Sequence, residues 1–286
     1  MLPNRNNRRR LIKAGLYSCL MTPLITKGQR HFRFCTTPVF LDGQMGLLER
    51  WSALLSEALQ AKVSFVQRRS YQAIVTLLKS KEADAAWLCG YPYVLNRDFL
   101  DLIAVPVYNG ASLYQSYLVV NSSDKSTKTI KDLGQTVFAY SDPLSNSGFL
   151  VPRHILLTAG ISPDQFFRKT FFTYSHQKVI QAVQERVADA GAVDSYVWET
   201  LAQQHAAAVS GMRVTWRSER YGFPPIVVRK GLPIDTTSRL KRSLLAMSES
   251  EEGQAILTQL NLQGFTAPLP ALYDSIHRMA RTSHVA

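Results

Sequence analysis

The amino-acid sequence predicts an α/β fold made of two successive units. From residue 31 onward, short β-rich runs alternate with amphipathic helical runs, a pattern typical of mostly parallel sheets flanked by helices. The alternation stops at residues 102–120, where two extended segments follow one another, and resumes at residue 136. A length of 286 residues is consistent with two units, since roughly 150 residues make one domain.

The first unit is predicted from five segments before residue 89. Strands are expected at 32–36, 63–67 and 85–88, and helices at 46–60 and 70–78. Ser70 is the expected N-cap of the second helix, because its hydroxyl can accept a first-turn N–H. The segment 85–88 is apolar throughout, so we expect this strand to be buried on both faces.

The second unit repeats the alternation after a polar turn region at 121–129. Strands are expected at 136–140, 168–174, 190–193 and 212–217, and helices at 148–159, 177–186 and 195–204. A further strand is expected at 226–228, after a turn at 221–225, and the chain is expected to be mainly helical from residue 236 onward.

Residues 1–27 resemble a bacterial twin-arginine export signal. Arg8-Arg9 and Leu11-Ile12-Lys13 precede an apolar run that is too short to span a bilayer. A basic start without a targeting role is the alternative. The residues before Cys19 also resemble a lipoprotein cleavage box, but Tyr17 is bulky for its position, so we do not expect anchoring there.

Charge and missing motifs argue against several classes of protein. Six positive charges lie in residues 1–27 without an acid, which leaves +6 of the net charge of +12 spread over the rest. No nucleic-acid partner is therefore expected. The sequence lacks the Walker A, G-x-S-x-G, H-E-x-x-H and paired C-x-x-C patterns. We expect neither an enzyme, nor a cofactor, nor a metal site.

The loop between the strand at 136–140 and the next helix is the first candidate binding site. It contains Ser145, Asn146, Ser147 and Gly148. A strand-to-helix loop of this kind presents hydroxyls and free backbone N–H groups at the positive end of a helix, which suits a small oxyanion. The alternative is a capped helix start that binds nothing.

Five blocks in order resemble the periplasmic substrate-binding proteins for phosphonate, phosphite and phosphate. They are 84–94, 114–120, 142–152, 189–195 and 224–229. The resemblance implies a type II two-lobed periplasmic-binding-protein fold, with lobe 1 formed by 28–114 plus 222–286 and lobe 2 by 115–221. It also implies a ligand site in the cleft between the lobes.

The resemblance places further residues beside the Ser145–Gly148 loop. His176 would donate to the anion and gain charge beside it, or else be a capping or core histidine. Asp194 would select ligands that carry a proton or an amine, or else only cap the next helix. The remaining expected ligand-binding residues are Tyr114, Tyr91 and Cys89.

Cys89 departs from the family pattern, since relatives commonly have a small pair after the strand at 85–88. Cys35 ends the neighbouring strand, which leaves three interpretations: a disulfide, two inert buried thiols, or a thiophilic site as in arsenite-sensing proteins that resemble the family. The prediction is a monomeric periplasmic protein that delivers a small oxyanion to an ABC permease. The alternative is an arsenite sensor that uses Cys89 and signals to a histidine kinase.

Overall fold

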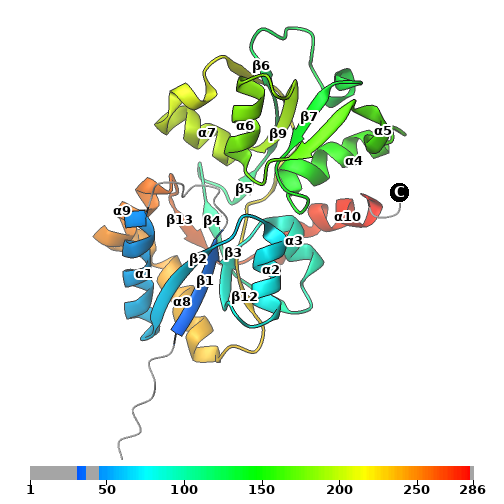
Figure 1. The fold of residues 1–286 in the computed structure, drawn as a ribbon. Coiled ribbons are helices and arrows are strands. Elements are labelled where there is room, and N and C mark those ends of the chain that lie inside the picture. Colours follow the sequence, from blue (N-terminus) through cyan, green and yellow to red (C-terminus); the bar gives the residue numbers. More distant parts are fainter. Residues whose placement is uncertain (1–30, 37–44, 284–286) are drawn as a thin grey trace, which may run out of the picture.

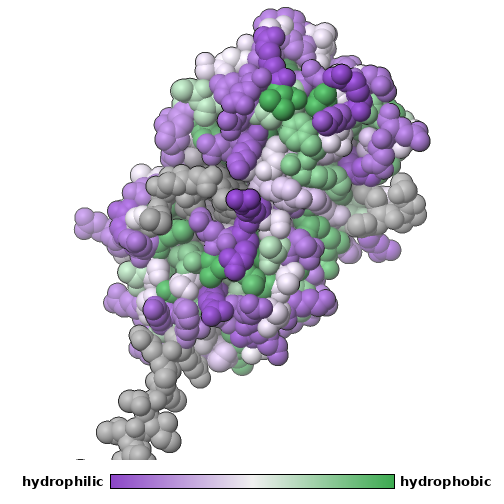
Figure 2. All heavy atoms as spheres, viewed as in Figure 1, coloured by the Kyte–Doolittle hydropathy of each residue, from purple (hydrophilic) through white to green (hydrophobic). Residues whose placement is uncertain are grey.

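The structure is a computed structural model that describes residues 31–36 and 45–283. Two lobes, each with a central sheet and flanking helices, lie one above the other in Figure 1. The expected export signal and Cys19 lie outside the described residues. No described helix is long and apolar enough to cross a membrane. Hydrophilic residues cover most of the molecular face in Figure 2, with small apolar patches between them.

Lobe 1 is built on a six-stranded sheet of order β13-β4-β12-β3-β1-β2. Its strands are β1 (His31–Thr36), β2 (Lys62–Gln67), β3 (Ala85–Trp87), β4 (Leu100–Val107), β12 (Ile226–Arg229) and β13 (Gly264–Thr266). β1 pairs in parallel with β2 and β3, whereas β12 runs antiparallel between β3 and β4. β3 is therefore central and fully buried, as its apolar sequence predicts.

The helices of lobe 1 come from both ends of the chain. They are α1 (Met45–Leu59), α2 (Tyr71–Lys79), α3 (Gly90–Leu95), α8 (Ile234–Leu245) and α9 (Glu251–Gln259). The last helix, α10 (Asp274–Ser283), packs both against α3 and against α4 (Val151–Thr158) of lobe 2. Ser70 is the N-cap of α2, and its Oγ accepts the N–H of Ala73 at 3.2 Å. This cap confirms the helix start expected from the sequence.

Lobe 2 is built on a five-stranded sheet of order β10-β6-β9-β7-β8. The strands are β6 (Ser116–Asn121), β7 (Val137–Tyr140), β8 (Lys169–Phe172), β9 (Ala190–Asp194) and β10 (Met212–Arg217). The helices are α4 (Val151–Thr158), α5 (Pro163–Phe166), α6 (His176–Gln184) and α7 (Ser195–Gln204). β7 pairs in parallel with β8 and β9, and β6 is antiparallel to β9 and β10.

Two short strands join the lobes. β5 (Leu113–Tyr114) leads into lobe 2, β11 (Tyr221–Gly222) leads out of it, and the two pair antiparallel. We propose the lobe boundaries that the sequence predicted, at residues 114/115 and 221/222, because both lie in this pair of strands. The family block at 114–120 is thus divided between β5 and β6.

Several elements were not predicted from the sequence, among them α5 and the strand β11, which lies where a turn was expected. Residues 90–95 form the short helix α3, although Gly90 and Pro92 are poor helix formers, and three residues near the C-terminus form β13. A π-helical turn over Asn146–Leu150 precedes α4, so this helical segment begins two residues before the expected start. π-turns are uncommon and often occur at functional sites.

Candidate functional site

The candidate site lies where the two lobes meet. Its centre is the loop from residue 141 to residue 150, called here the β7–α4 loop, which packs against β6 and β9 of lobe 2 and against α3 of lobe 1. Within it, Ser141, Asp142, Ser145, Asn146 and Ser147 are buried. Buried polar side chains at a junction between lobes need partners, so their hydrogen bonds define the site.

Ser145 fixes the shape of this loop. Its Oγ accepts the N–H of Gly148 at 3.0 Å, and its carbonyl accepts the N–H of Leu150 at 2.9 Å, which closes the π-turn. Gly148 has no space for a side chain, because a Cβ there would lie 1.9 Å from the Oγ of Ser141 and 3.1 Å from the carbonyl oxygen of Ala192. The loop is therefore closely packed and can hold its donors in fixed positions.

Asn146 connects the loop to lobe 1 and to the crossing strand. Its backbone N–H donates to the Sγ of Cys89 at 3.3 Å, and its Nδ2 donates to the hydroxyl of Tyr114 at 3.0 Å. The Oδ1 atom of Asn146 is buried and has no hydrogen-bond partner. An unsatisfied buried acceptor of this kind costs free energy, and a ligand that carries a proton would satisfy it.

Ser147 is placed by β6 and β9. Its carbonyl accepts the hydroxyl of Ser116 at 2.6 Å, and Ser116 pairs with Asp194 in the antiparallel register of the two strands. Ser147 is 1 % exposed. The sheet therefore brings Ser147 and Asp194 to the same end of lobe 2.

His176 and Asp194 are in direct contact. The Nδ1 of His176 accepts the backbone N–H of Asp194 at 3.2 Å, so the neutral ring carries its proton on Nε2, which is then a donor. Burial lowers the pKa of His176 to about 3. Burial therefore favours the neutral ring in this arrangement, and the expectation that His176 gains charge beside a bound anion stays a prediction.

Asp194 caps α7, which was the alternative role expected for this residue. Its Oδ1 accepts the N–H of Tyr196 at 2.8 Å. Burial raises the pKa of Asp194 to about 7, although backbone N–H groups at the start of α7 act in the opposite direction. A carboxyl group with this pKa is half protonated near neutrality, so it can accept from or donate to a bound group.

Cys89 is the N-cap residue of α3 and lies among these groups. Burial raises its pKa to about 11, against the effect of hydrogen bonds from Asn146, Tyr91 and Tyr114. Cys35 and Cys89 are both free and buried, so they form no disulfide in the structure. The thiolate is the form that binds soft metals and metalloids. Because burial keeps Cys89 in the thiol form, the structure favours the interpretation of two inert buried thiols.

Tyr114 and Tyr91, two further expected site residues, approach Cys89 in different ways. The pKa of Tyr114 is raised well above its usual value, first by burial and then by Cys89 and Asp194, which places the phenol beside both. Tyr91 joins through its backbone N–H, which donates to Cys89. Burial raises the pKa of the Tyr91 phenol, and the charge of Arg153 in α4 opposes that effect.

Two residues of the same loop were not predicted from the sequence. Ser141 has a buried Oγ without a hydrogen-bond partner. Asp142 accepts the N–H of Tyr71 in lobe 1 through Oδ2 at 3.1 Å, and the N–H of Leu144 through Oδ1 at 2.7 Å. The available signal was their position directly after the buried strand β7, where polar residues meet at the carboxyl edge of a sheet.

The charges at this junction are unusual for an anion site. Among the described residues no Lys or Arg is buried, whereas Asp142 and Asp194 are. No described group of three or more His, Cys, Asp or Glu residues could hold a metal ion. The junction offers an anion backbone N–H groups, hydroxyls and a neutral imidazole, and Arg69 lines a small cavity there together with Ser141, Asp142 and His176.

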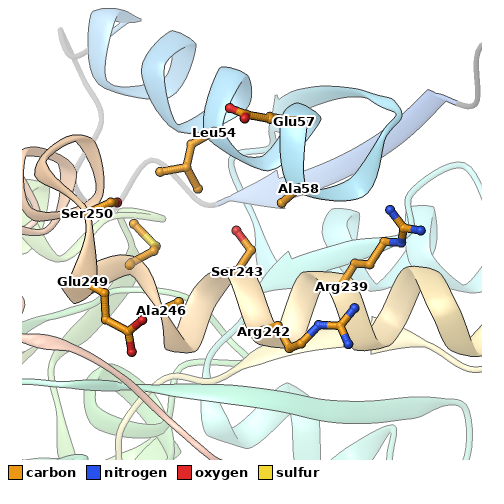
Figure 3. Close-up of a pocket in the computed structure, with 10 residues that line it drawn as sticks. Leu54, Glu57, Ala58, Arg239, Arg242, Ser243, Ala246, Glu249 and Ser250 are labelled. Atoms are coloured by element: carbon orange, nitrogen blue, oxygen red, sulfur yellow. The ribbon is translucent and has the colours of Figure 1, made fainter.

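A separate hollow of about 510 Å³ lies between α1 and α8 on the outside of lobe 1 (Figure 3). Arg239 and Arg242 of α8, Glu57 of α1 and Glu249 line it together with six other residues. None of the residues expected from the sequence lines this hollow. The candidate site is therefore the junction of the lobes and not this groove.

Two α/β lobes joined by a pair of crossing strands, with buried polar groups between them, define a type II periplasmic binding protein. A family model described as "ABC transporter, phosphonate, periplasmic substrate-binding protein" matches residues 36–273. The chain belongs to this family of periplasmic substrate-binding proteins, which work with ABC transporters and are not enzymes.

Curated relatives agree with this assignment. The probable ABC transporter phosphite binding protein PhnD1 of Prochlorococcus marinus is 28% identical over 243 residues, which cover 81% of this chain and 82% of the relative. The phosphonates-binding periplasmic protein of Escherichia coli is 24% identical over 239 residues, which cover 79% of this chain and 69% of the relative.

Solved structures share the fold. The binding protein component of an ABC phosphonate transporter from Pseudomonas aeruginosa has a TM-score of 0.82 at 20% identity, covering 90% of this chain and 87% of its own. PhnD1 of Prochlorococcus marinus in complex with methylphosphonate has a TM-score of 0.79 at 24% identity, covering 90% of this chain and 99% of its own. The predicted family and fold class are confirmed.

Proposed function

We propose that this protein captures a small phosphorus oxyanion that still carries a proton, in a cleft between its lobes, and delivers it to an inner-membrane ABC permease. The observation that carries the proposal is the composition of the buried junction. Ser145, Asn146 and Ser147 lie in a closely packed loop, His176 is a neutral donor, and Asp194 is one of the two buried carboxyl groups at the junction, with Asp142.

Asp194 is the basis for the protonation requirement. An ionised carboxylate repels a bound anion unless a proton lies between the two groups. With a pKa near 7, Asp194 can share one proton with a hydrogen phosphate, phosphite or phosphonate anion. Sulfate has no proton to share at neutral pH, so this site should reject it.

Ser145 and Ser147 provide a matched pair of variants. Ser147→Ala removes a hydroxyl from the loop, and losing a hydrogen bond to a charged ligand costs about 1.5–3 kcal/mol, or about ten-fold to a hundred-fold in affinity. Ser145→Ala removes the N-cap contact to Gly148, so it should also lower the free energy of unfolding by about 1 kcal/mol. The Ser147→Ala protein should keep wild-type stability.

A thermal-shift screen of the purified protein tests the proposal. Phosphate, phosphite, methylphosphonate, aminoethylphosphonate, sulfate and arsenite are compared, with and without a reductant. A rise in melting temperature with at least one phosphorus oxyanion and none with sulfate is expected. A response to arsenite alone, abolished in Cys89→Ser, would reject the proposal.

A further inference from the structure

Asp142 is a lobe 2 residue whose carboxylate reaches lobe 1. Its Oδ2 accepts the backbone N–H of Tyr71, the first residue of α2, and its Oδ1 accepts the N–H of Leu144 in its own loop. The residue is 4 % exposed. One buried carboxylate therefore ties the backbone of the β7–α4 loop to the start of a helix in the other lobe.

The start of α2 is suited to this contact. The first N–H groups of a helix have no intrahelical partner, and the helix dipole favours a negative charge at this end. Ser70 already satisfies the N–H of Ala73, so the N–H of Tyr71 remains for a partner from outside the helix. Asp142 supplies that partner, and the bond exists only while the two lobes are in contact.

We propose that Asp142 is a positioning residue that stabilises the closed arrangement of the lobes and thereby sets the affinity for the ligand. Both of its oxygens accept backbone N–H groups, so its role is to hold the β7–α4 loop against α2. This inference rests on the proposed function, because a ligand captured by lobe closure binds more tightly when the closed form is more populated.

A pair of substitutions at Tyr71 isolates this one hydrogen bond. Tyr71→Pro and Tyr71→Ala both remove the phenol, but only proline also removes the N–H. Proline is well tolerated at the first position of a helix. Ser70 has φ −128° and ψ 150°, an extended conformation that the residue before a proline favours. Both variants should therefore fold, and Tyr71→Pro should melt at a lower temperature than Tyr71→Ala, because it leaves one buried oxygen of Asp142 without its donor.

Calorimetric titration with phosphate and methylphosphonate provides the readout. We expect the Tyr71→Pro protein to bind about ten-fold more weakly than Tyr71→Ala, the lower end for a hydrogen bond to a charged group. In the Asp142→Ala background this difference should disappear. Equal affinities of the two Tyr71 variants, or a difference that persists without Asp142, would overturn the inference.

Small-angle scattering separates this inference from the proposed function. If wild-type protein binds none of the anions, the proposed function fails, but the contact can still be tested without ligand. The Tyr71→Pro protein should then have a larger radius of gyration than Tyr71→Ala, because its lobes separate more readily. An identical radius of gyration in that case would also reject the role of Asp142.

Discussion

Replacing Gly148 by alanine should disable the β7–α4 loop without unfolding the protein. The added Cβ would lie 1.9 Å from the Oγ and 2.8 Å from the Cβ of Ser141, and 3.1 Å from the carbonyl oxygen of Ala192. A rotation of Ser141 relieves only the first of these contacts, so the loop must move away from β9. Overpacking of this kind costs about 1–3 kcal/mol of stability.

The effect on binding should be larger than the effect on stability. A displaced loop misplaces the Ser147 hydroxyl and the backbone donors together, and each hydrogen bond lost to a charged ligand costs about 1.5–3 kcal/mol. Calorimetry should therefore show at least a hundred-fold weaker binding of a phosphorus oxyanion, on the order of 3 kcal/mol.

Two further variants control this experiment. Gly46→Ala lies in α1, where a Cβ meets nothing within 4 Å, so it should leave binding unchanged and raise stability slightly. Adding Ser141→Gly to Gly148→Ala removes the two shortest contacts and should restore part of the affinity. Wild-type binding by the Gly148→Ala protein would refute the role assigned to the loop.

The remaining predictions concern protonation and export. Asp194 has its pKa raised to about 7, so its contribution to stability is present below its usual pKa of 3.8 and is lost as the pH rises to about 7. His176 has its pKa lowered from 6.5 to about 3, so its contribution is present above pH 6.5 and is lost as the pH falls to about 3. The free energy of unfolding, measured by urea titration, should therefore change with pH between about 4 and 6.5 relative to wild type, rising for Asp194→Asn and falling for His176→Asn. Profiles that run parallel to the wild-type profile would contradict both assignments. Changing Arg8 and Arg9 to lysine should keep the precursor in the cytoplasm, and unchanged periplasmic yield in cell fractionation would reject the twin-arginine interpretation.

The sequence predicted those features that depend on local patterns. Ser70 as a cap, β3 as a buried strand and the placement of α7 directly after Asp194 all follow from residues within one turn or one strand of each other. The β7–α4 loop was located from its position between a predicted strand and a predicted helix, and the family resemblance placed His176 beside it, although His176 lies outside the five blocks.

The contacts between lobes could not be predicted in the same way. Asn146 meets Cys89 across 57 positions and Asp142 meets Tyr71 across 71, and both pairs depend on how the lobes come together rather than on local propensity. The neutral state of His176 could not be predicted from local sequence either. It follows from burial and from the hydrogen bond that the backbone N–H of Asp194, at the end of β9, donates to the ring.

Titration of the wild-type protein with phosphate, phosphite, methylphosphonate and sulfate, at several pH values, tests the central claim most directly. At least one phosphorus oxyanion should bind, with an affinity that falls as the pH rises past the second ionisation of the ligand, about 6 for phosphoryl groups, while sulfate does not bind. Asp194→Asn should weaken that pH dependence and admit sulfate. Tight sulfate binding by wild type, or a pH profile that Asp194→Asn leaves intact, would contradict the claim that Asp194 shares a proton with the ligand.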